Sequence, residues 1–563
     1  MNGRLLAIMT LAAVLTWSAQ WHWSQTIDEP QHLWAGLRIV QQWDFSRFDN
    51  SKMPVSSLNA VGWLLSQSPG VQGSWFWARA PQVVWLLGTV GLVFVWARRL
   101  GGARVALGAA ALVALDPNLV AHAGLVTTDL PCTFAVLLAC FTWVNFMEEP
   151  SPGRAVIAGA ALGFAQVAKF TGLFLVPIVG IILILGCWLR RTTAPVRQLP
   201  LAVLAGLFSL NLCYGFSGTF TPANEVRWKS EPFSVLSTVT LPLPVPRPWI
   251  EGVDWVKHDD DQGQGRVYAS GEKTHFGRPD HYLRTLPRKW PLPLMVLGLM
   301  GLAVGMRRRD QNRLQLLGVV VPPLFFLLWF SFAFNSQVGN RYLLPVVPFL
   351  GLWAAQLPAR WLVAGAGWTL VSALSWWPWS LSYFNETVTD RSQAWRIVAD
   401  SDLDWGQTDA VAKEWLVLHP DGRVDPDVPA PGDVLLSANR LTGVLGHPAM
   451  MACYREHLPP TTHLAGALYP LSHVAGDFAS CFPVVDVVEG TGLLPAGEHL
   501  LLIRFRGTAS LRVGEHIEQS SSDDEALLGL VVKARTSFTP DWTLPEGASV
   551  YLNGVVIAGA ERP

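Results

Sequence analysis

Long apolar stretches recur along the first two thirds of the chain, separated by shorter polar or charged segments. A helix needs roughly 20 consecutive apolar residues to cross the hydrocarbon core of a bilayer. The pattern therefore predicts a mainly α-helical membrane protein with about eleven transmembrane helices. The expected spans lie at residues 4–21, 81–97, 104–121, 130–147, 154–168, 170–188, 199–216, 291–306, 314–333, 341–357 and 361–379.

The composition agrees with this interpretation. Hydrophobic residues make up 50% of the 563 residues and charged residues 15%, whereas about 25% of a soluble domain is charged. The chain has 27 Trp, a residue that favours the membrane–water interface. The net charge of −1 gives no reason to expect a nucleic-acid partner.

The positions of the arginines predict the orientation. Loops on the cytoplasmic side carry an excess of Lys and Arg, and alternate short loops contain Arg98, Arg99, Arg104, Arg154, Arg190, Arg191, Arg197, Arg307, Arg308, Arg309, Arg313 and Arg360. The N-terminus is then cytoplasmic and the C-terminus extracytoplasmic. A cleaved signal peptide is the alternative for residues 1–19, but no clear small-residue cleavage site precedes Trp21, so we expect an uncleaved first helix.

The chain is predicted to contain three parts. Residues 1–380 form a multi-span membrane domain with outer segments 22–75 and 217–290, and helical apolar spacing within 22–75 predicts amphipathic helices on the membrane surface. Residues 381–480 alternate strand and helix, with a helix at 409–418. Residues 481–563 are β-rich, with strands expected at 499–505, 528–534 and 549–557, a hairpin turn at Asn553-Gly554 and a solvated loop at 520–525.

The six cysteines divide into two groups. Cys132, Cys140, Cys187 and Cys213 lie in or beside apolar spans and are expected to be small buried hydrophobes. Cys453 and Cys481 lie in the tail and could form a disulfide if the tail is outside the cytoplasm. No Cys/His cluster has the spacing of a zinc site.

Acids and cations stand at several predicted helix ends on the outer face. Asp28-Glu29-Pro30 follows the first span, and Asp129 with Pro131 opens the fourth, so helix capping is the ordinary explanation for both acids. If the two loops converge, their carboxylates suit a general base acting on a hydroxyl.

The cations Lys169 and Arg341-Tyr342 also stand at span ends, where they could anchor the interface or hold a phosphate. A transporter or lipid flippase explains such charges equally well.

The order of several motifs resembles a known family. Residues 26–32 (TIDEPQH) with Gly36, residues 115–122 (LDPNLVAH), residues 126–131 (VTTDLP), residues 168–171 (AKFT), residues 339–345 (GNRYLLP) and residues 400–407 (DSDLDWGQ) occur in succession. Together they resemble the protein mannosyltransferase-like members of the membrane-embedded GT-C class of glycosyltransferases. Residues beyond about 480 lie outside this resemblance, and Ser51-Lys52-Met53-Pro54-Val55 departs from the His-Pro-Pro-Leu element common in the family.

The resemblance implies an inverting transfer of a sugar from a polyprenyl phosphate to an acceptor on the extracytoplasmic face. Asp28 would be the general base and Asp129 would position a substrate. Arg341, with Lys169 and Lys52, would hold the donor phosphate. Glu29 is a further catalytic candidate, and the supporting candidates are His32, His122 and Tyr342.

The implied scheme requires no cofactor, although a divalent metal stays open because some relatives use one. The expected partners are membrane lipids, a polyprenyl-phosphate-linked sugar and a protein, lipid or polysaccharide acceptor. The expected location is the inner or plasma membrane. A transporter or flippase, or an inactive relative that serves as an assembly partner, is the alternative function.

Overall fold

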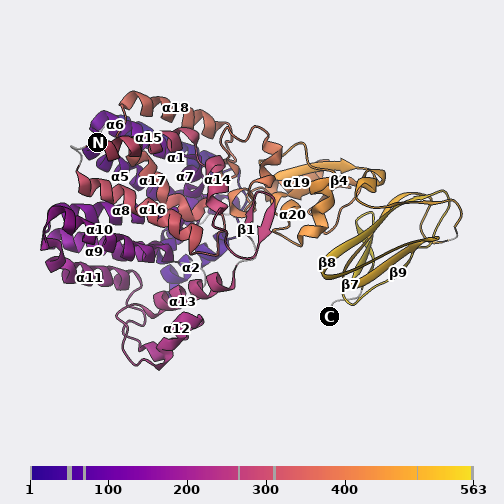
Figure 1. Ribbon diagram of the computed structural model, residues 1–563, viewed down its shortest axis with the longest axis horizontal. Coiled ribbons are helices and arrows are strands. Elements are labelled where there is room, and N and C mark those ends of the chain that lie inside the picture. The colour runs from indigo at the N-terminus through magenta and orange to yellow at the C-terminus, as the bar shows by residue number, and fades with distance from the viewer. Residues whose placement is uncertain are drawn as a thin grey trace. The chain divides into compact units, whose positions relative to one another are not determined.

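The computed structural model divides the chain into two compact units (Figure 1). The membrane unit comprises Met1–Val267 and Thr274–Val388, and the tail unit comprises Tyr268–Lys273 and Thr389–Pro563. The expected boundaries at 380 and 480 remain predictions. The structure describes residues 3–46, 53–66, 71–263, 267–308, 312–490 and 492–559.

The membrane unit consists mostly of helices that run alongside one another (Figure 1). Each expected span coincides with a helix or a pair of helices. These are α1 (Gly3–Gln20), α5 (Val83–Gly101), α6 (Ala103–Ala114), α7 (Pro117–Ala123), α8 (Asp129–Glu148), α9 (Pro152–Ala168), α10 (Leu175–Arg190), α11 (Ala194–Cys213), α15 (Leu292–Arg307), α16 (Arg313–Phe332), α17 (Val347–Ala354) and α18 (Ala359–Leu374).

Within the described residues, five helical stretches are long and apolar enough to cross a membrane: Trp75–Gly101, Asp129–Glu148, Phe170–Arg190, Ala194–Cys213 and Arg313–Phe332. Two bent pairs, α6 with α7 and α14 (His281–Lys289) with α15, raise this number to as many as seven. The chain is therefore a multi-pass membrane protein. The larger number of about eleven spans remains a prediction.

The bend between α6 and α7 is 63° and lies at Asp116-Pro117. The Asp116 carboxylate accepts the backbone N–H groups of Asn118 at 2.9 Å and Leu119 at 3.0 Å, which makes it the N-cap of α7. Pro117 stands at the first helical position, where its missing N–H costs nothing. The expected span at 104–121 is thus two helices joined by a capped turn.

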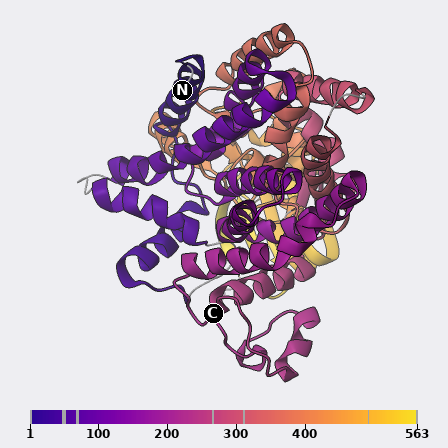
Figure 2. The same ribbon diagram turned by 90° about the vertical axis from the view of Figure 1, so that its left-hand side faces the viewer.

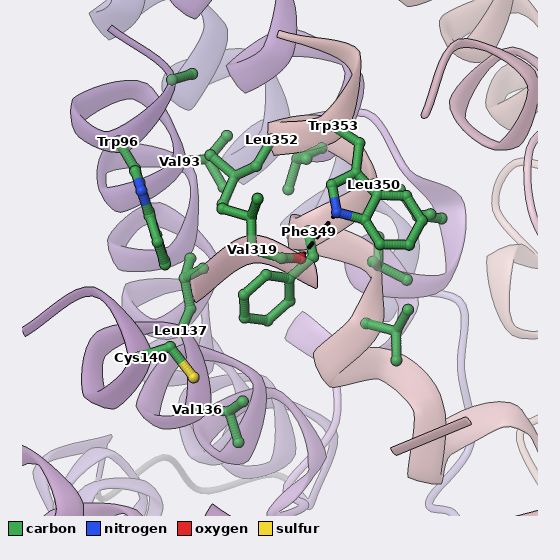
Figure 3. Close-up of a cluster of buried hydrophobic side chains, with 14 of the residues drawn as sticks. Val93, Trp96, Val136, Leu137, Cys140, Val319, Phe349, Leu350, Leu352 and Trp353 are labelled. Atoms are coloured by element: carbon green, nitrogen blue, oxygen red, sulfur yellow. Dashed lines mark hydrogen bonds between the residues drawn. The ribbon is translucent and has the colours of Figure 1, made fainter. Parts of the chain in front are cut away.

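Large and small apolar side chains fill the centre of the membrane unit (Figure 3). Trp353 of α17 donates its indole N–H to the carbonyl of Val319 in α16 at 2.8 Å. Trp96 of α5 donates to the Gln315 side chain at 2.6 Å. Both indole groups are buried, and each pairing avoids the cost of an unsatisfied donor in the apolar interior.

The short, small-residue helix α9 lies directly against α11. A Cβ atom on Gly159 would be 1.9 Å from the carbonyl oxygen of Ala202, and one on Gly163 would be 2.2 Å from that of Gly206. Glycines four residues apart let two helix backbones approach closely in a membrane.

Shorter helices occupy the predicted outer segments. The segment 22–75 contains α2 (Glu29–Gln42), η1 (Pro54–Ser56), α3 (Ser57–Ser66) and the start of α4 (Val71–Arg79), which confirms the expected helices. The long loop contains α12 (Glu231–Ser234) and α13 (Arg247–Gln262), followed by the strands β1 (Val267–Ala269) and β2 (Glu272–Thr274) and then α14.

The first part of the tail unit is a small α/β region. Its sheet has the order β3 (Arg423–Val424), β4 (Gly432–Ser437), β5 (Leu468–His473), with β3 parallel and β5 antiparallel to β4. The expected helix at 409–418 is α19 (Asp409–Leu418), and the short helices α20 (Ala438–Thr442) and α21 (Ala452–Glu456) lie between β4 and β5 in the chain.

The last part of the tail unit is a β-sheet with the order β11-β10-β7-β8-β6, in which β9 also pairs with β7. Asn553-Gly554 forms the expected hairpin turn between β10 and β11. The strands are β6 (Val484–Val487), β7 (Gly497–Val513), β8 (His516–Ala534), β9 (Asp541–Thr543), β10 (Ser549–Leu552) and β11 (Val555–Gly559).

The expectation of a loop at 520–525 is wrong, because these residues continue β8. Ser520, Ser521 and Ser522 pair with residues 507–509 of β7, and the Thr508 hydroxyl donates to that of Ser521 at 3.0 Å. The backbone ladder does not require apolar side chains, so a polar hairpin arm can extend beyond the packed part of a sheet.

Cys453 and Cys481 form a disulfide, the pairing that the sequence left open. It joins α21 to the end of η11 (Ala475–Ser480) within the tail unit. Disulfides persist in oxidising compartments. The other four cysteines are free.

This arrangement predicts the alkylation pattern of the unfolded protein. When the protein is denatured in detergent and treated with a maleimide of high mass, we expect four modifications before reduction and six after it. The increments are counted as gel shifts, and a Cys453→Ser/Cys481→Ser variant should show four in both lanes. Six modifications before reduction would contradict the disulfide.

Candidate active site

The Asp28 carboxylate points away from the helix that follows it. Asp28 is the N-cap residue of α2, yet its side chain makes no capping hydrogen bond. Instead, Arg341 Nη1 lies 3.0 Å from Asp28 Oδ2, and Arg341 Nε donates to the carbonyl of Val338 at 3.2 Å. The expected capping role of Asp28 is therefore wrong, because an ion pair with a residue 313 positions away takes the carboxylate.

A second buried acid stands beside this pair. Lys169 Nζ lies 2.6 Å from Asp129 Oδ1, and His122 Nδ1 lies 3.5 Å from Asp129 Oδ2. Lys169 also lies over the ring of Tyr342, at 4.6 Å from its centroid. Asp129 makes no side-chain cap to α8, whose N-cap is Thr128, so the capping explanation fails here as well.

The predicted convergence of the two outer loops is thus present. Tyr342 follows Arg341 in the short helix η6 (Asn340–Val346) and contacts Lys169, which links the Asp28–Arg341 pair to the Asp129–Lys169 pair. We call these residues the acid–cation cluster: Asp28, Asp129, Lys169, Arg341 and Tyr342.

The charge state of Asp28 follows from its neighbours. Burial raises the pKa of the Asp28 carboxyl, but the charges of Arg341 and His32 outweigh burial and hold its pKa below the usual range. His32 is buried on α2 one turn after Asp28. Asp28 is therefore ionised at neutral pH, the form that can accept a proton.

Glu29, adjacent to Asp28, is fully buried and fully hydrogen-bonded. Arg79 donates to its two carboxylate oxygens from Nε at 2.8 Å and from Nη2 at 2.6 Å. The backbone N–H groups of Thr26 and Val126 each donate at 2.9 Å. With its oxygens engaged in this way, Glu29 is better suited to holding the loop in place than to the catalytic role predicted for it.

Arg79 is the important residue that the sequence analysis did not single out. Its remaining N–H groups donate to the carbonyls of residues 20, 23 and 24, so it joins α1, the first outer loop and α4. One sequence feature could have identified Arg79: it stands on the predicted outer side just before the span at 81–97, where the positive-inside rule predicts few cations.

Two further predicted positions in the first outer segment are Gly36 and Lys52. A Cβ atom on Gly36 would lie 2.4 Å from the Ser56 carbonyl oxygen, so α2 packs so closely against η1 that only glycine fits there. Lys52, which was predicted to contact phosphate, lies outside the described residues.

The turn that leads to Arg341 is held by side chains of the long outer loop. Asp260 of α13 accepts the backbone N–H groups of Asn335 and Ser336, both at 2.9 Å. The Gln337 amide accepts the N–H of Arg278 at 2.7 Å and donates to the carbonyl of the same residue at 3.1 Å. Burial raises the pKa of Asp260 although these N–H groups lower it.

The DWGQ motif lies in the tail unit and forms a closed turn. Gln407 accepts the N–H of Trp405 at 2.7 Å and donates to the carbonyl of Leu403 at 2.8 Å. The Asn439 side chain donates to the Asp404 carbonyl at 2.8 Å. These contacts explain the motif as a structural element of this unit.

No group of three or more His, Cys, Asp and Glu side chains suited to a metal ion occurs within the described ranges. The absence of a cofactor requirement remains a prediction.

Residues 60–214 match the family described as dolichyl-phosphate-mannose-protein mannosyltransferase. This region contains Arg79, His122, Asp129 and Lys169. The match confirms the predicted resemblance to mannosyltransferase-like membrane enzymes and the enzyme class, a glycosyltransferase. No curated protein sequence matches the chain significantly.

Two solved structures show weaker similarity. ArnT from Cupriavidus metallidurans bound to undecaprenyl phosphate is similar at 16% identity, a TM-score of 0.48 and coverage of 70% of this chain and 69% of that chain. The Archaeoglobus fulgidus oligosaccharyltransferase in complex with zinc and sulfate is similar at 9% identity and a TM-score of 0.45, with 98% of each chain covered.

The buried pair Glu29–Arg79 yields a stability prediction. Arg79→Met leaves an uncompensated buried carboxylate and should lower the free energy of unfolding by about 3–5 kcal/mol. Adding Glu29→Gln removes that charge, so the double variant should recover part of the loss. Thermal unfolding in detergent measures both effects.

Arg154→Met is the matched control, because Arg154 pairs with Glu149 in an exposed position, where an ion pair contributes about 0–1 kcal/mol. Strictly additive losses in the Glu29/Arg79 double variant would show that the two side chains do not stabilise one another.

Asp404 yields a pH prediction for the tail unit. Burial raises the pKa of Asp404 to about 7, and the neighbouring Asp425 also raises it. The folded state therefore holds a proton between about pH 4 and 7 that the unfolded state releases, so the free energy of unfolding falls as pH rises through this range. Asp404→Asn removes this contribution.

We expect the melting temperature of Asp404→Asn, relative to that of the unmodified protein, to rise from pH 5 to pH 8. The measurement is thermal unfolding of the full-length protein, and Asp421→Asn, at an exposed position, is the control. A pH-independent difference for Asp404→Asn would refute the assignment.

Proposed function

We propose that this protein transfers a sugar from a polyprenyl phosphate to an acceptor on the extracytoplasmic face, with inversion at the anomeric carbon. The observation that carries the proposal is the 3.0 Å contact between the Asp28 carboxylate and the Arg341 guanidinium, next to the Asp129–Lys169 pair. A base and a phosphate-binding cation in one site suit a single displacement, in which the acceptor and the leaving phosphate both need a charged partner.

In this displacement the acceptor hydroxyl or amine attacks the anomeric carbon. The bond between that carbon and the phosphate oxygen breaks, and its electron pair leaves with the phosphate. Asp28 takes the acceptor proton, and Arg341 stabilises the negative charge that develops on the phosphate. The guanidinium can donate two parallel hydrogen bonds to phosphate oxygens.

The Asp28–Arg341 pair also couples donor binding to basicity. In the free protein, Arg341 helps to hold the pKa of Asp28 low, which makes the carboxylate a weak base. A phosphate bound to Arg341 neutralises part of that positive charge. The pKa of Asp28 then rises and the carboxylate becomes a stronger base when the donor is in place.

Asp129 and Lys169 are proposed to orient the substrates. Lys169 is held between Asp129 and the Tyr342 ring. Its positive charge is therefore partly neutralised by Asp129 before a phosphate binds. We therefore assign the primary phosphate contact to Arg341 and a secondary one to Lys169. Asp129, fixed by Lys169 and His122, is placed to accept a hydrogen bond from a sugar or acceptor hydroxyl.

The charge pattern and the tail disulfide support the proposed location. The arginine-rich loops predict a cytoplasmic N-terminus and an extracytoplasmic C-terminus, and a Cys453–Cys481 disulfide favours an oxidising compartment. The proposed enzyme lies in the inner or plasma membrane and meets its lipid-linked donor at the outer face. Protein, lipid and polysaccharide acceptors all fit this scheme.

The proposal predicts that Asp28→Asn lowers the rate of sugar transfer by at least ~100-fold, because general-base catalysis contributes about 10²–10⁴-fold. Binding of the donor should persist, since Arg341 remains. The assay uses purified protein in detergent, a panel of polyprenyl-phosphate-linked hexoses and pentoses, and release or transfer of the labelled sugar.

Asp44→Asn is the matched control, because Asp44 pairs with Arg38 near the end of α2, outside the acid–cation cluster. Arg341→Gln should instead raise the KM for the donor, with a further loss in kcat. Normal turnover by Asp28→Asn would exclude the base assignment. Absence of transfer from every lipid-linked sugar would count against the enzyme's proposed donor class.

A further inference from the structure

Between α11 and α13 the chain forms a long loop region that contains the short helix α12. We call residues 216–243 the outrigger. In Figure 1 this segment, with α12, lies beside α11 and α13, and Figure 2 shows it outside the group of long helices. The outrigger begins three residues after α11 ends at Cys213, so it starts near one end of a candidate transmembrane helix.

The outrigger exposes large apolar side chains. Phe220, Val235 and Leu241 are 64%, 67% and 64% exposed, values that would be costly for a set of large apolar residues in water. The neighbouring helix α11 also exposes large apolar side chains, among them Val203, Leu204, Phe208 and Leu212.

The outrigger is internally ordered by its own hydrogen bonds. Its two arms form a ladder in which the N–H groups of Phe220, Ala223 and Asn224 donate to the carbonyls of residues 243, 241 and 239 at 2.8–3.1 Å. The Trp228 indole N–H donates to the Ala223 carbonyl at 2.9 Å and its ring packs against Phe233. The exposed side chains are therefore presented on a fixed support.

Buried polar residues join the outrigger to the membrane unit. Asp254 of α13 accepts the N–H groups of Lys229 at 2.6 Å and Ser230 at 3.1 Å. Asn211 of α11 donates to the Pro244 carbonyl at 3.0 Å and accepts from Thr219 at 2.5 Å. Asn211 thus holds both ends of the outrigger against α11, and Asp254 holds its middle against α13.

The charges of the outrigger cancel. Its charged residues are Glu225, Arg227, Lys229 and Glu231, two of each sign. A surface with no net charge does not favour an anionic headgroup or an acidic partner. Exposed apolar side chains without net charge suit the boundary between headgroups and acyl chains.

We propose that the outrigger rests on the outer leaflet of the membrane and places Phe220, Val235 and Leu241 in its interfacial region. The proposed occupant of this apolar surface is thus lipid, as for the exposed face of the candidate span α11, whose Phe208 ring contacts that of Phe216 at the start of the outrigger. Burial in the interface would remove from water the apolar area that the fold leaves exposed.

This contact would also fix the depth of α13. Asp254 of α13 holds the outrigger, and Asp260, nearly two turns further along the same helix, holds the turn that leads to Arg341. The outrigger would thereby set the height of the phosphate-binding arginine above the bilayer. This consequence rests on the proposed role of Arg341, whereas the lipid contact itself does not.

Fluorescence quenching in a bilayer tests the lipid contact without reference to activity. Cysteines are placed one at a time at positions 235 and 241, the four free cysteines are replaced, and a bimane label is attached. The labelled protein is reconstituted in phosphatidylcholine vesicles, with brominated phosphatidylcholine as the lipid quencher and iodide as the aqueous quencher. Position 203 on α11 is the lipid control, and position 417 on α19, 79% exposed in the tail unit, is the water control.

We expect labels at 235 and 241 to be quenched by brominated lipid to the same extent as the label at 203, and the label at 417 to be quenched by iodide alone. Iodide quenching at 235 and 241 equal to that at 417 would overturn the proposal. Protection from both quenchers would overturn it too, because protein would then cover the surface. A lipid effect that appears only in anionic vesicles would refute the apolar mode of contact.

Discussion

Burial of acids near the ends of an apolar helix bundle is the constraint on which the rest of this structure depends. An isolated carboxylate is unstable in such a place, so a buried or half-buried acid needs a cation or hydrogen-bond donors beside it. Glu29 has Arg79 and Asp28 has Arg341, and a third pair stands at the start of α8. Each pair joins segments that are distant in sequence, which fixes how the outer loops meet.

The two adjacent acids of the first loop have different roles. Glu29 is closed off by Arg79 and two backbone N–H groups, and this immobilises the loop. Asp28 is then held facing Arg341 while 35% of its side chain remains exposed. A rigid, ionised and partly accessible carboxylate beside a guanidinium is the arrangement that the proposed transfer needs, because both groups act only if their geometry is set beforehand.

Much of the fold follows from local patterns, and the errors have physical causes. Apolar stretches located the long apolar helices, though not the polar helix α13, and Asn553-Gly554 located a hairpin, because period and turn chemistry act over a few residues. The prediction of a loop at the polar stretch 520–525 was wrong, because a β-ladder can continue through polar residues once the neighbouring strand is in place. Asp28 and Asp129 stand at helix starts and yet cap nothing, because a buried cation competes better than a backbone N–H.

By itself the sequence located the apolar helices, predicted the class of enzyme and named acids and cations that lie close together in the fold. The tertiary structure alone decided which acid pairs with which cation, that Arg79 closes the first loop, and that Lys169 is engaged by Asp129. The physical reason is that pairing depends on distance and burial, which are set by packing among helices far apart in the chain, whereas spans and caps are encoded within a few neighbouring residues.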